Sequence, residues 1–241
     1  MYDFTVYVIT CFCAAMLQSL CGFGSGVFIM SVLPHFFSAY TFSLVLSPLV
    51  SLVICLAVLG KEYRHINIRM IIPAIIGNAA AVTSIMFFWS GNADDAMKKL
   101  LGCFLILLSI YFIFFNSSFK IKQTPKAGVL AGILGGTANS FFSMGGPPAV
   151  AYFIATCRNN KEYIASSQAY FSFSCIFVTT SRYVRGMITD DIWPFFLAGL
   201  PFIALGTWAG LKLFGMLNVK MLRLTIYIFM AVSGAVMIFT N

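Results

Sequence analysis

Long apolar runs without a charged side chain are the feature that most constrains how this chain can fold. Seven such runs cover residues 4–60, 70–93, 100–119, 127–157, 163–181, 192–211 and 224–241. A helix needs about 20 apolar residues to cross a bilayer. Charged residues make up only 9% of the chain, whereas a soluble domain carries roughly 25%. We therefore expect an all-α integral membrane protein, and the apolar start is expected to remain because no basic segment precedes it.

Two of the runs, residues 4–60 and 127–157, do not have the length of a whole number of crossings. Residues 40–60 form a good span by themselves, which leaves residues 4–39. Both awkward segments contain glycine-rich interruptions, Gly22-Phe23-Gly24-Ser25-Gly26 and Phe142-Ser143-Met144-Gly145-Gly146-Pro147-Pro148. Glycine allows backbone angles that other residues avoid, and proline suits the first turn of a new helix. Each segment is therefore either one broken crossing or a hairpin that enters the membrane and returns.

The distribution of lysine and arginine favours the hairpins. With two hairpins six spans remain, which places Lys98, Lys99, Arg182 and Arg185 on one side and the other eleven basic residues on the opposite side. Eight true crossings would divide the same residues eight against seven. The uneven division follows the positive-inside rule. It places both termini outside the cytoplasm.

The two halves of the chain resemble each other. At an offset of 120, Ser25-Gly26 falls on Gly145-Gly146, Ser19 on Asn139 and Ser47 on Ser167. We expect one membrane domain built from two repeats, residues 1–119 and 120–241, each a broken segment plus three transmembrane helices. An odd number of crossings per half inverts the second repeat, which is an architecture of many secondary transporters.

The interruptions are the candidate functional site. The first turn of a helix has N–H groups without partners and a partial positive charge, so it binds anions. We expect new helices at Val27 and Pro147 to hold one small anion between them. The candidate substrate-binding residues are Gln18, Ser19, Gly24, Ser25, Gly26, Ser47, Asn139, Ser143, Gly145, Gly146, Ser167 and Gln168.

Other residue types restrict the mechanism. The seven acidic residues all lie at the expected ends of spans, whereas proton relays usually place a carboxylate in the membrane. Export of an anion down the inside-negative potential needs no such group. The sequence gives no sign of an enzyme, a cofactor, a metal site or a nucleic-acid partner, and the seven cysteines are expected to act as small hydrophobes. Arg182 and Arg185 either attract substrate at a vestibule or extend to the membrane interface.

Glycine-rich motifs in both halves resemble those of the TauE/SafE sulfite exporter family. They are Gly22 to Gly26 with the residues to Pro34, and Ala131-Gly132-Ile133-Leu134-Gly135-Gly136 leading to Gly145-Gly146-Pro147-Pro148. The pattern from Leu200 to Gly210 and then Lys220 to Arg223 is also similar. The resemblance implies a plasma-membrane permease for sulfite, sulfonates or related small anions. Gly24-Ser25-Gly26 departs from the family's common three glycines, which leaves the particular anion open.

Several alternatives remain from the sequence. The chain could instead be a passive anion channel, or a permease that takes up a carboxylate or another sulfur anion. Cys11-x-Cys13 is the only support for an intramembrane redox or assembly factor, and a structural subunit is a further alternative. Glycines spaced by four, at 128, 132 and 136 and at 206 and 210, serve either packing within the chain or a homodimer.

Overall fold

The computed structural model describes residues 2–37, 39–88, 94–114, 124–213 and 219–239, and the regular structure in them is entirely helical. The first half contains α1 (Tyr2–Cys21), α2 (Ser25–Phe36), α3 (Tyr40–Glu62), the short 3₁₀ helix η1 (Tyr63–His65), α4 (Ile68–Phe88) and α5 (Asp94–Phe114). The second half contains α6 (Pro125–Phe142), α7 (Gly146–Thr156), α8 (Asn160–Val184), α9 (Ile192–Leu213) and α10 (Val219–Phe239). The expected boundary between the two repeats, at residues 119 and 120, lies outside the described residues.

The apolar runs locate the helices because each run can only satisfy its backbone inside a bilayer by forming one. Every expected span corresponds to one helix, from α3 over the run at 40–60 to α10 over the run at 224–241. Within the described residues, α1, α3, α4, α5 and α9 are long and apolar enough to cross a membrane. The fold is that of a multi-pass membrane protein.

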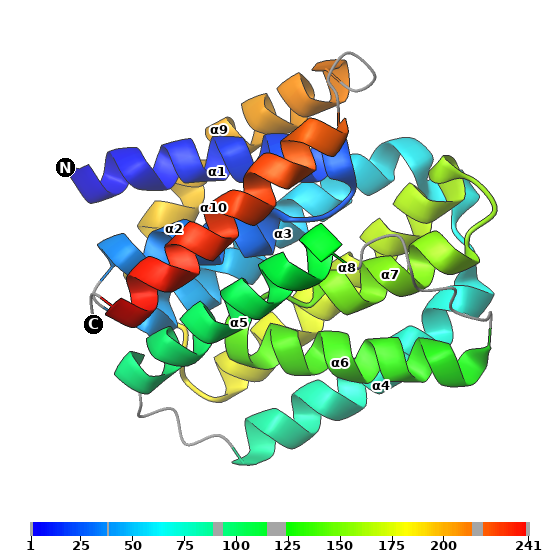
Figure 1. The fold of residues 1–241 in the computed structure, drawn as a ribbon, viewed down its shortest axis with the longest axis horizontal. Coiled ribbons are helices and arrows are strands. Elements are labelled where there is room, and N and C mark those ends of the chain that lie inside the picture. Colours follow the sequence, from blue (N-terminus) through cyan, green and yellow to red (C-terminus); the bar gives the residue numbers. More distant parts are fainter. Residues whose placement is uncertain (1, 38, 89–93, 115–123, 214–218, 240–241) are drawn as a thin grey trace.

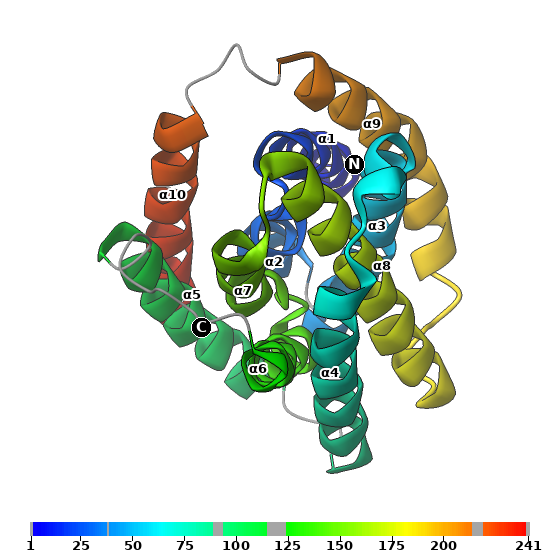
Figure 2. The same cartoon turned by 90° about the vertical axis from the view of Figure 1, so that its right-hand side faces the viewer.

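The main helix pairings each join a helix of the first half to a helix of the second. α4 packs against α6, and the corresponding helix α9 packs against α1. α3 packs against its counterpart α8, and α5 against its counterpart α10. Figure 2 shows the short helices α2 and α7 in the middle of the molecule, with α5 and α10 on one side and α3, α4, α8 and α9 on the other.

Glycine makes the two closest helix pairings possible. A Cβ atom on Gly132 of α6 would lie 2.0 Å from the carbonyl oxygen of Ala74 on α4. A Cβ atom on Gly206 of α9 would lie 2.3 Å from the carbonyl oxygen of Phe12 on α1. Small residues let helix backbones approach in membranes. The glycine faces that left a homodimer open are therefore occupied by packing within the chain.

The interrupted segments double back on themselves. In Figure 1, α1 and α2 run in opposite directions, and so do α6 and α7. The start of α1 and the end of α10 lie at the left end of that view, whereas α6 starts at the right end. Each half therefore begins at a different end of the molecule, and the interruptions point inwards from opposite ends.

Candidate functional site

Both interruptions are three residues long and depend on left-handed backbone angles. α1 ends at Cys21 and α2 begins at Ser25, while α6 ends at Phe142 and α7 begins at Gly146. The φ angles of Gly22 and Gly24 are +79° and +112°. Ser143 has a φ of 53° and is the one non-glycine residue with positive φ in the described chain. Glycine adopts this region without the steric cost that other residues meet.

The new helices begin earlier than the sequence predicted, at Ser25 instead of Val27 and at Gly146 instead of Pro147. The residue before each helix is a glycine, Gly24 or Gly145, and neither helix start is capped by a side chain. The N–H groups of the first turn therefore remain available to a ligand. The prolines at 147 and 148 have no N–H, so α7 offers fewer of these donors than α2.

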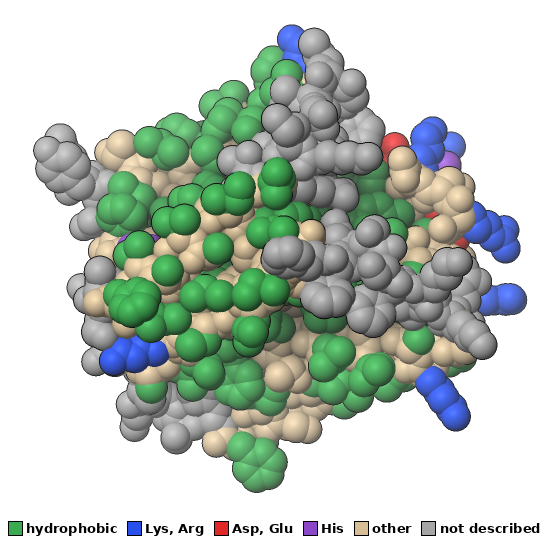
Figure 3. Space-filling view, viewed as in Figure 1, with side chains coloured by type: hydrophobic (Ala, Val, Ile, Leu, Met, Phe, Trp, Pro, Cys, Tyr) green, Lys and Arg blue, Asp and Glu red, His purple; other side chains and the backbone are tan. Residues whose placement is uncertain are grey.

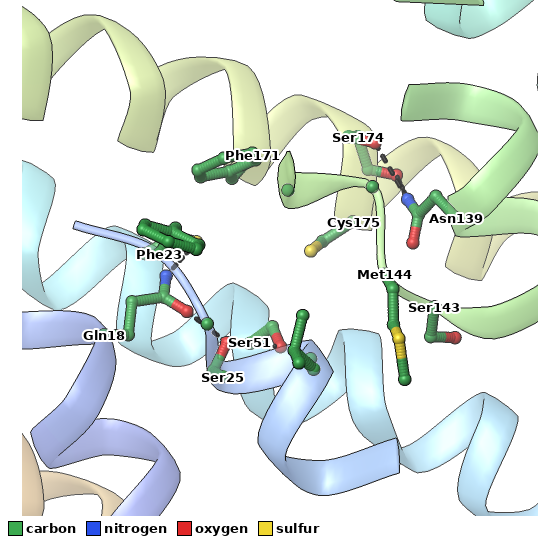
Figure 4. Close-up of a pocket in the computed structure, with 16 residues that line it drawn as sticks. Gln18, Phe23, Ser25, Ser51, Asn139, Ser143, Met144, Phe171, Ser174 and Cys175 are labelled. Atoms are coloured by element: carbon green, nitrogen blue, oxygen red, sulfur yellow. Dashed lines mark hydrogen bonds between the residues drawn. The ribbon is translucent and has the colours of Figure 1, made fainter. Parts of the chain in front are cut away.

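One cavity lies between the two interruptions. The centre of a water-sized molecule can occupy a volume of about 40 Å³ inside it. A single water needs only about 10–15 Å³ by this measure. Its walls come from both interruptions and from the facing helices α3 and α8. In Figure 4, Gln18, Ser25 and Ser51 lie on one side of it and Asn139 and Ser174 on the other. The cavity is thus shared by the two halves of the chain.

Eight of the twelve candidate residues line this cavity. They are Gln18, Gly24, Ser25, Gly26, Asn139, Ser143, Gly145 and Gly146. The hydroxyl of Ser25 donates to Oε1 of Gln18 and lies 2.8 Å from the hydroxyl oxygen of Ser51. Nδ2 of Asn139 donates to Oγ of Ser174 over 2.8 Å. Polar side chains from both halves are therefore held at the cavity wall.

The other four candidates lie outside the lining. Ser19 and Ser167 donate to carbonyl oxygens in their own helices, those of Ala15 and Ile164. Ser47 is buried close to Gly26, and its hydroxyl has no hydrogen-bond partner among the described residues.

Gln168, the fourth of these, positions the first interruption. Its Nε2 donates to the carbonyl oxygen of Gly22 over 2.7 Å, and its Oε1 accepts from Nε2 of Gln18 over 3.0 Å. Gln168 therefore supports the cavity wall from behind.

The helix boundaries at the two interruptions lie 121 residues apart, whereas the sequence comparison used an offset of 120. α1 and α6 end at Cys21 and Phe142, and α2 and α7 begin at Ser25 and Gly146. Asn139 thus corresponds to Gln18, and both line the cavity. The sequence comparison paired Asn139 with Ser19, because matching residue types does not reveal which face of a helix points inwards.

Eight lining residues were not among the predicted site residues. They are Phe23, Val27, Ser51, Cys55, Met144, Phe171, Ser174 and Cys175. Ser174 could have been recognised only from the tertiary structure, since it accepts hydrogen bonds from Asn139 and, over 2.9 Å, from Nδ2 of Asn78 on α4. Phe23 and Phe171 make the remaining wall partly apolar.

Arg182 occupies neither of the positions that the sequence suggested. Its side chain is 0% exposed, so it lies neither in a vestibule nor at the membrane interface. The guanidinium donates to the carbonyl oxygens of Leu44, Asn139 and Ser140 over 2.6, 3.0 and 3.0 Å, and to Oγ of Ser143 over 2.9 Å. The C-terminal end of a helix carries partial negative charge. Arg182 therefore fixes the end of α6 and the second interruption against α3, whereas Arg185 is exposed as expected.

The lining of the cavity contains no Asp or Glu among the described residues. A cluster of three or more His, Cys, Asp or Glu side chains suited to a metal ion is also absent from the part of the chain that the structure describes. The seven cysteines are free thiols. The electrostatic character of the site is set by the two helix starts and the adjacent buried guanidinium.

The fold and this cavity define a multi-pass helical membrane protein with a small polar site between two interrupted helices. A family model described as "Sulfite exporter TauE/SafE" matches residues 7–237, and the chain belongs to this family of membrane transporters. A search of curated proteins and a search of solved structures each gave no match.

Proposed function

We propose that this protein binds a small sulfur-containing anion, sulfite or an organosulfonate, in the cavity between the interruptions and exports it across the plasma membrane. The observation that carries the proposal is that two uncapped helix starts, at Ser25 and Gly146, open into one cavity. Each supplies unpaired N–H groups and about half a positive charge. The family membership is the reason for preferring sulfur oxyanions over other small anions.

The surroundings of the cavity support an anion as the ligand. The polar lining side chains are hydroxyls and amides, which are hydrogen-bond donors. In the structure, those of Gln18, Ser25, Asn139 and Ser143 donate to protein acceptors. A bound anion would exchange these bonds for bonds to its own oxygen atoms, beside the N–H groups of the helix starts. Arg182 adds a buried positive charge that hydrogen-bonds to the lining residue Ser143. With no acidic side chain in the lining, little opposes a negative ligand. We place the binding role on the eight candidate residues that reach the cavity, with Gln168 supporting them.

The helix arrangement supports transport by inverted repeats. α1 of the first half packs against α9 of the second, and α6 of the second half packs against α4 of the first. Each half begins at a different end of the molecule (Figure 1). Repeats of this kind can rock about a fixed central site and expose it to each side in turn. Export needs no coupling ion, because the membrane potential favours anion exit by about 2.3 kcal/mol per charge per 100 mV.

Thermal stability of the purified protein against a panel of anions tests the proposal. Sulfite, thiosulfate, sulfate, sulfoacetate, taurine, chloride and acetate form the panel. A ligand at 100 times its dissociation constant stabilises by about 2.7 kcal/mol, which is visible as a melting shift. We expect a shift with a sulfur anion, and absence of a shift with every member would reject the binding site.

The variant Gly146→Leu tests whether the anion that causes the melting shift binds in this cavity. A Cβ atom on Gly146 would lie 3.9 Å from Phe23 and 4.0 Å from Phe171, so a leucine side chain fits without a backbone clash and fills the cavity. It should abolish the shift. Gly60→Leu is the matched control, because a Cβ atom there meets nothing within 4 Å and Gly60 is exposed near the end of α3.

Anion efflux from reconstituted vesicles distinguishes a transporter from a channel with the same site. Efflux that saturates with substrate and is accelerated by anion on the far side indicates alternating access. Efflux that rises linearly and ignores the far side indicates a channel.

A further inference from the structure

The cavity wall contains two cysteines that the binding proposal does not use. Cys55 of α3 and Cys175 of α8 both line the cavity and are buried. The side chains of Cys55 and Cys175 interact with each other where α3 packs against α8. It also accepts a hydrogen bond of 2.9 Å from Nε2 of Gln18. Figure 4 shows the sulfur of Cys175 pointing from α8 into the cavity.

The position of this pair connects the two halves of the molecule. Cys55 and Cys175 are separated by 120 residues, and their helices α3 and α8 pack against each other as counterparts in the two halves. Each half therefore contributes one thiol to the same point of the shared cavity. The remaining five cysteines, at 11, 13, 21, 103 and 157, lie outside the lining of this cavity.

We propose that Cys55 and Cys175 are a site of oxidative modification, at which a peroxide converts the two thiols into a disulfide that joins the halves across the anion cavity. One thiol attacks the O–O bond of the peroxide and becomes a sulfenic acid, releasing water. The second thiol then displaces the hydroxyl as a second water while the S–S bond forms. The two thiols together lose two electrons and two protons, and the peroxide is reduced to two molecules of water.

The disulfide would stop transport because it fixes one half to the other. Alternating access requires the repeats to move about the central site, whereas an S–S bond holds two sulfur atoms about 2.05 Å apart. This part of the inference rests on the proposed transport function. The cavity has room for a small oxidant, because its volume of about 40 Å³ exceeds what a water molecule needs.

The experiment treats the full-length protein in proteoliposomes with hydrogen peroxide and then identifies linked peptides by mass spectrometry without reduction. We expect a peptide pair joining Cys55 to Cys175, a fall in anion flux of at least about tenfold, and recovery of both after dithiothreitol. A variant that keeps only these two cysteines should respond in the same way. Cys175→Ser, compared with its own untreated flux, should neither cross-link nor lose flux reversibly.

Two results would overturn the inference. One is the absence of the linked peptide under conditions that oxidise the exposed Cys103. The other is a quantitative Cys55–Cys175 link with unchanged flux, which would show that the halves need not separate there. Failure of the proposed function is recognised separately, because reduced protein would then show no anion-dependent melting shift. In that case the claim that the disulfide stops transport is refuted as well, and the linked peptide alone decides whether the thiols react.

Discussion

At the scale of single residues, Arg182 is the side chain whose role the sequence least revealed. Arginines near the end of an apolar run look alike in sequence, whether they extend to the interface or turn inwards. Only the structure shows that the carbonyls of Leu44, Asn139 and Ser140 surround Arg182. Buried charge is tolerated where hydrogen bonds satisfy it. The carbonyl oxygens of Leu44 and Asn139 also accept from Ser143, so the guanidinium depends on these oxygens more than they depend on it.

Replacement of Arg182 by methionine should lower the free energy of unfolding by at least about 3 kcal/mol, because it removes four buried hydrogen bonds from a charged donor. Arg182→Lys should fall between the wild type and the methionine variant, since an ammonium group cannot reach all four acceptors with the geometry of the guanidinium. Thermal melting in detergent measures the effect. Lys161→Met, at the exposed start of the same helix, should change the melting temperature little. Equal loss in both methionine variants would contradict the structural role of Arg182.

At the scale of helices, much of the fold could be predicted because a bilayer leaves few alternatives to an apolar run. The spans, the two interruptions and the recurrence of the helix order all followed from charge-free length and glycine. The interior arrangement could not be predicted in the same way. Ser19 and Gln18 are neighbours in sequence, yet only Gln18 faces the cavity. Cys55 and Cys175 read as small hydrophobes until α3 and α8 are seen to face each other.

The close contact between α4 and α6 gives a prediction at the same scale. Gly132→Ala would place a methyl group 2.0 Å from the carbonyl oxygen of Ala74, so the two helices must separate. Overpacking of this kind costs about 1–3 kcal/mol, and we expect a clearly lower melting temperature. Gly60→Ala adds the same methyl group where nothing lies within 4 Å, and it should be neutral or stabilising because alanine favours helix. A neutral result for Gly132→Ala would mean that the helices do not pack this closely.

At the scale of the whole molecule, the basic residues gather at one end. Figure 3 shows most of the visible Lys and Arg side chains at the right end, where α3 ends and α6 and α8 begin, and a smaller group at the lower left. The exposed residues of those helix ends include Lys61, Lys126 and Lys161. From the positive-inside rule we propose that this end faces the cytoplasm. The opposite end, where α1 starts and α10 finishes, would then face outwards.

Tags fused to the two termini test this orientation. In sealed, right-side-out vesicles both tags should be cleaved by an added protease, while a lysine-directed impermeant reagent should leave Lys61, Lys126 and Lys161 unlabelled. Inverted vesicles should give the reverse pattern and serve as the control. Cleavage of one tag alone would rule out the arrangement in which both hairpins return to their own side.

The prolines at the start of α7 have a consequence for the kinetics of the proposed carrier. Ser25, Gly26 and Val27 each have an N–H in the first turn of α2, whereas Pro147 and Pro148 remove two such donors from α7. An anion in the cavity is therefore held more firmly by one half than by the other. Inward-facing and outward-facing forms then release it at different rates, and forward and reverse transport saturate at different concentrations. The anion concentrations on the two sides at which forward and reverse transport are equal do not depend on this asymmetry.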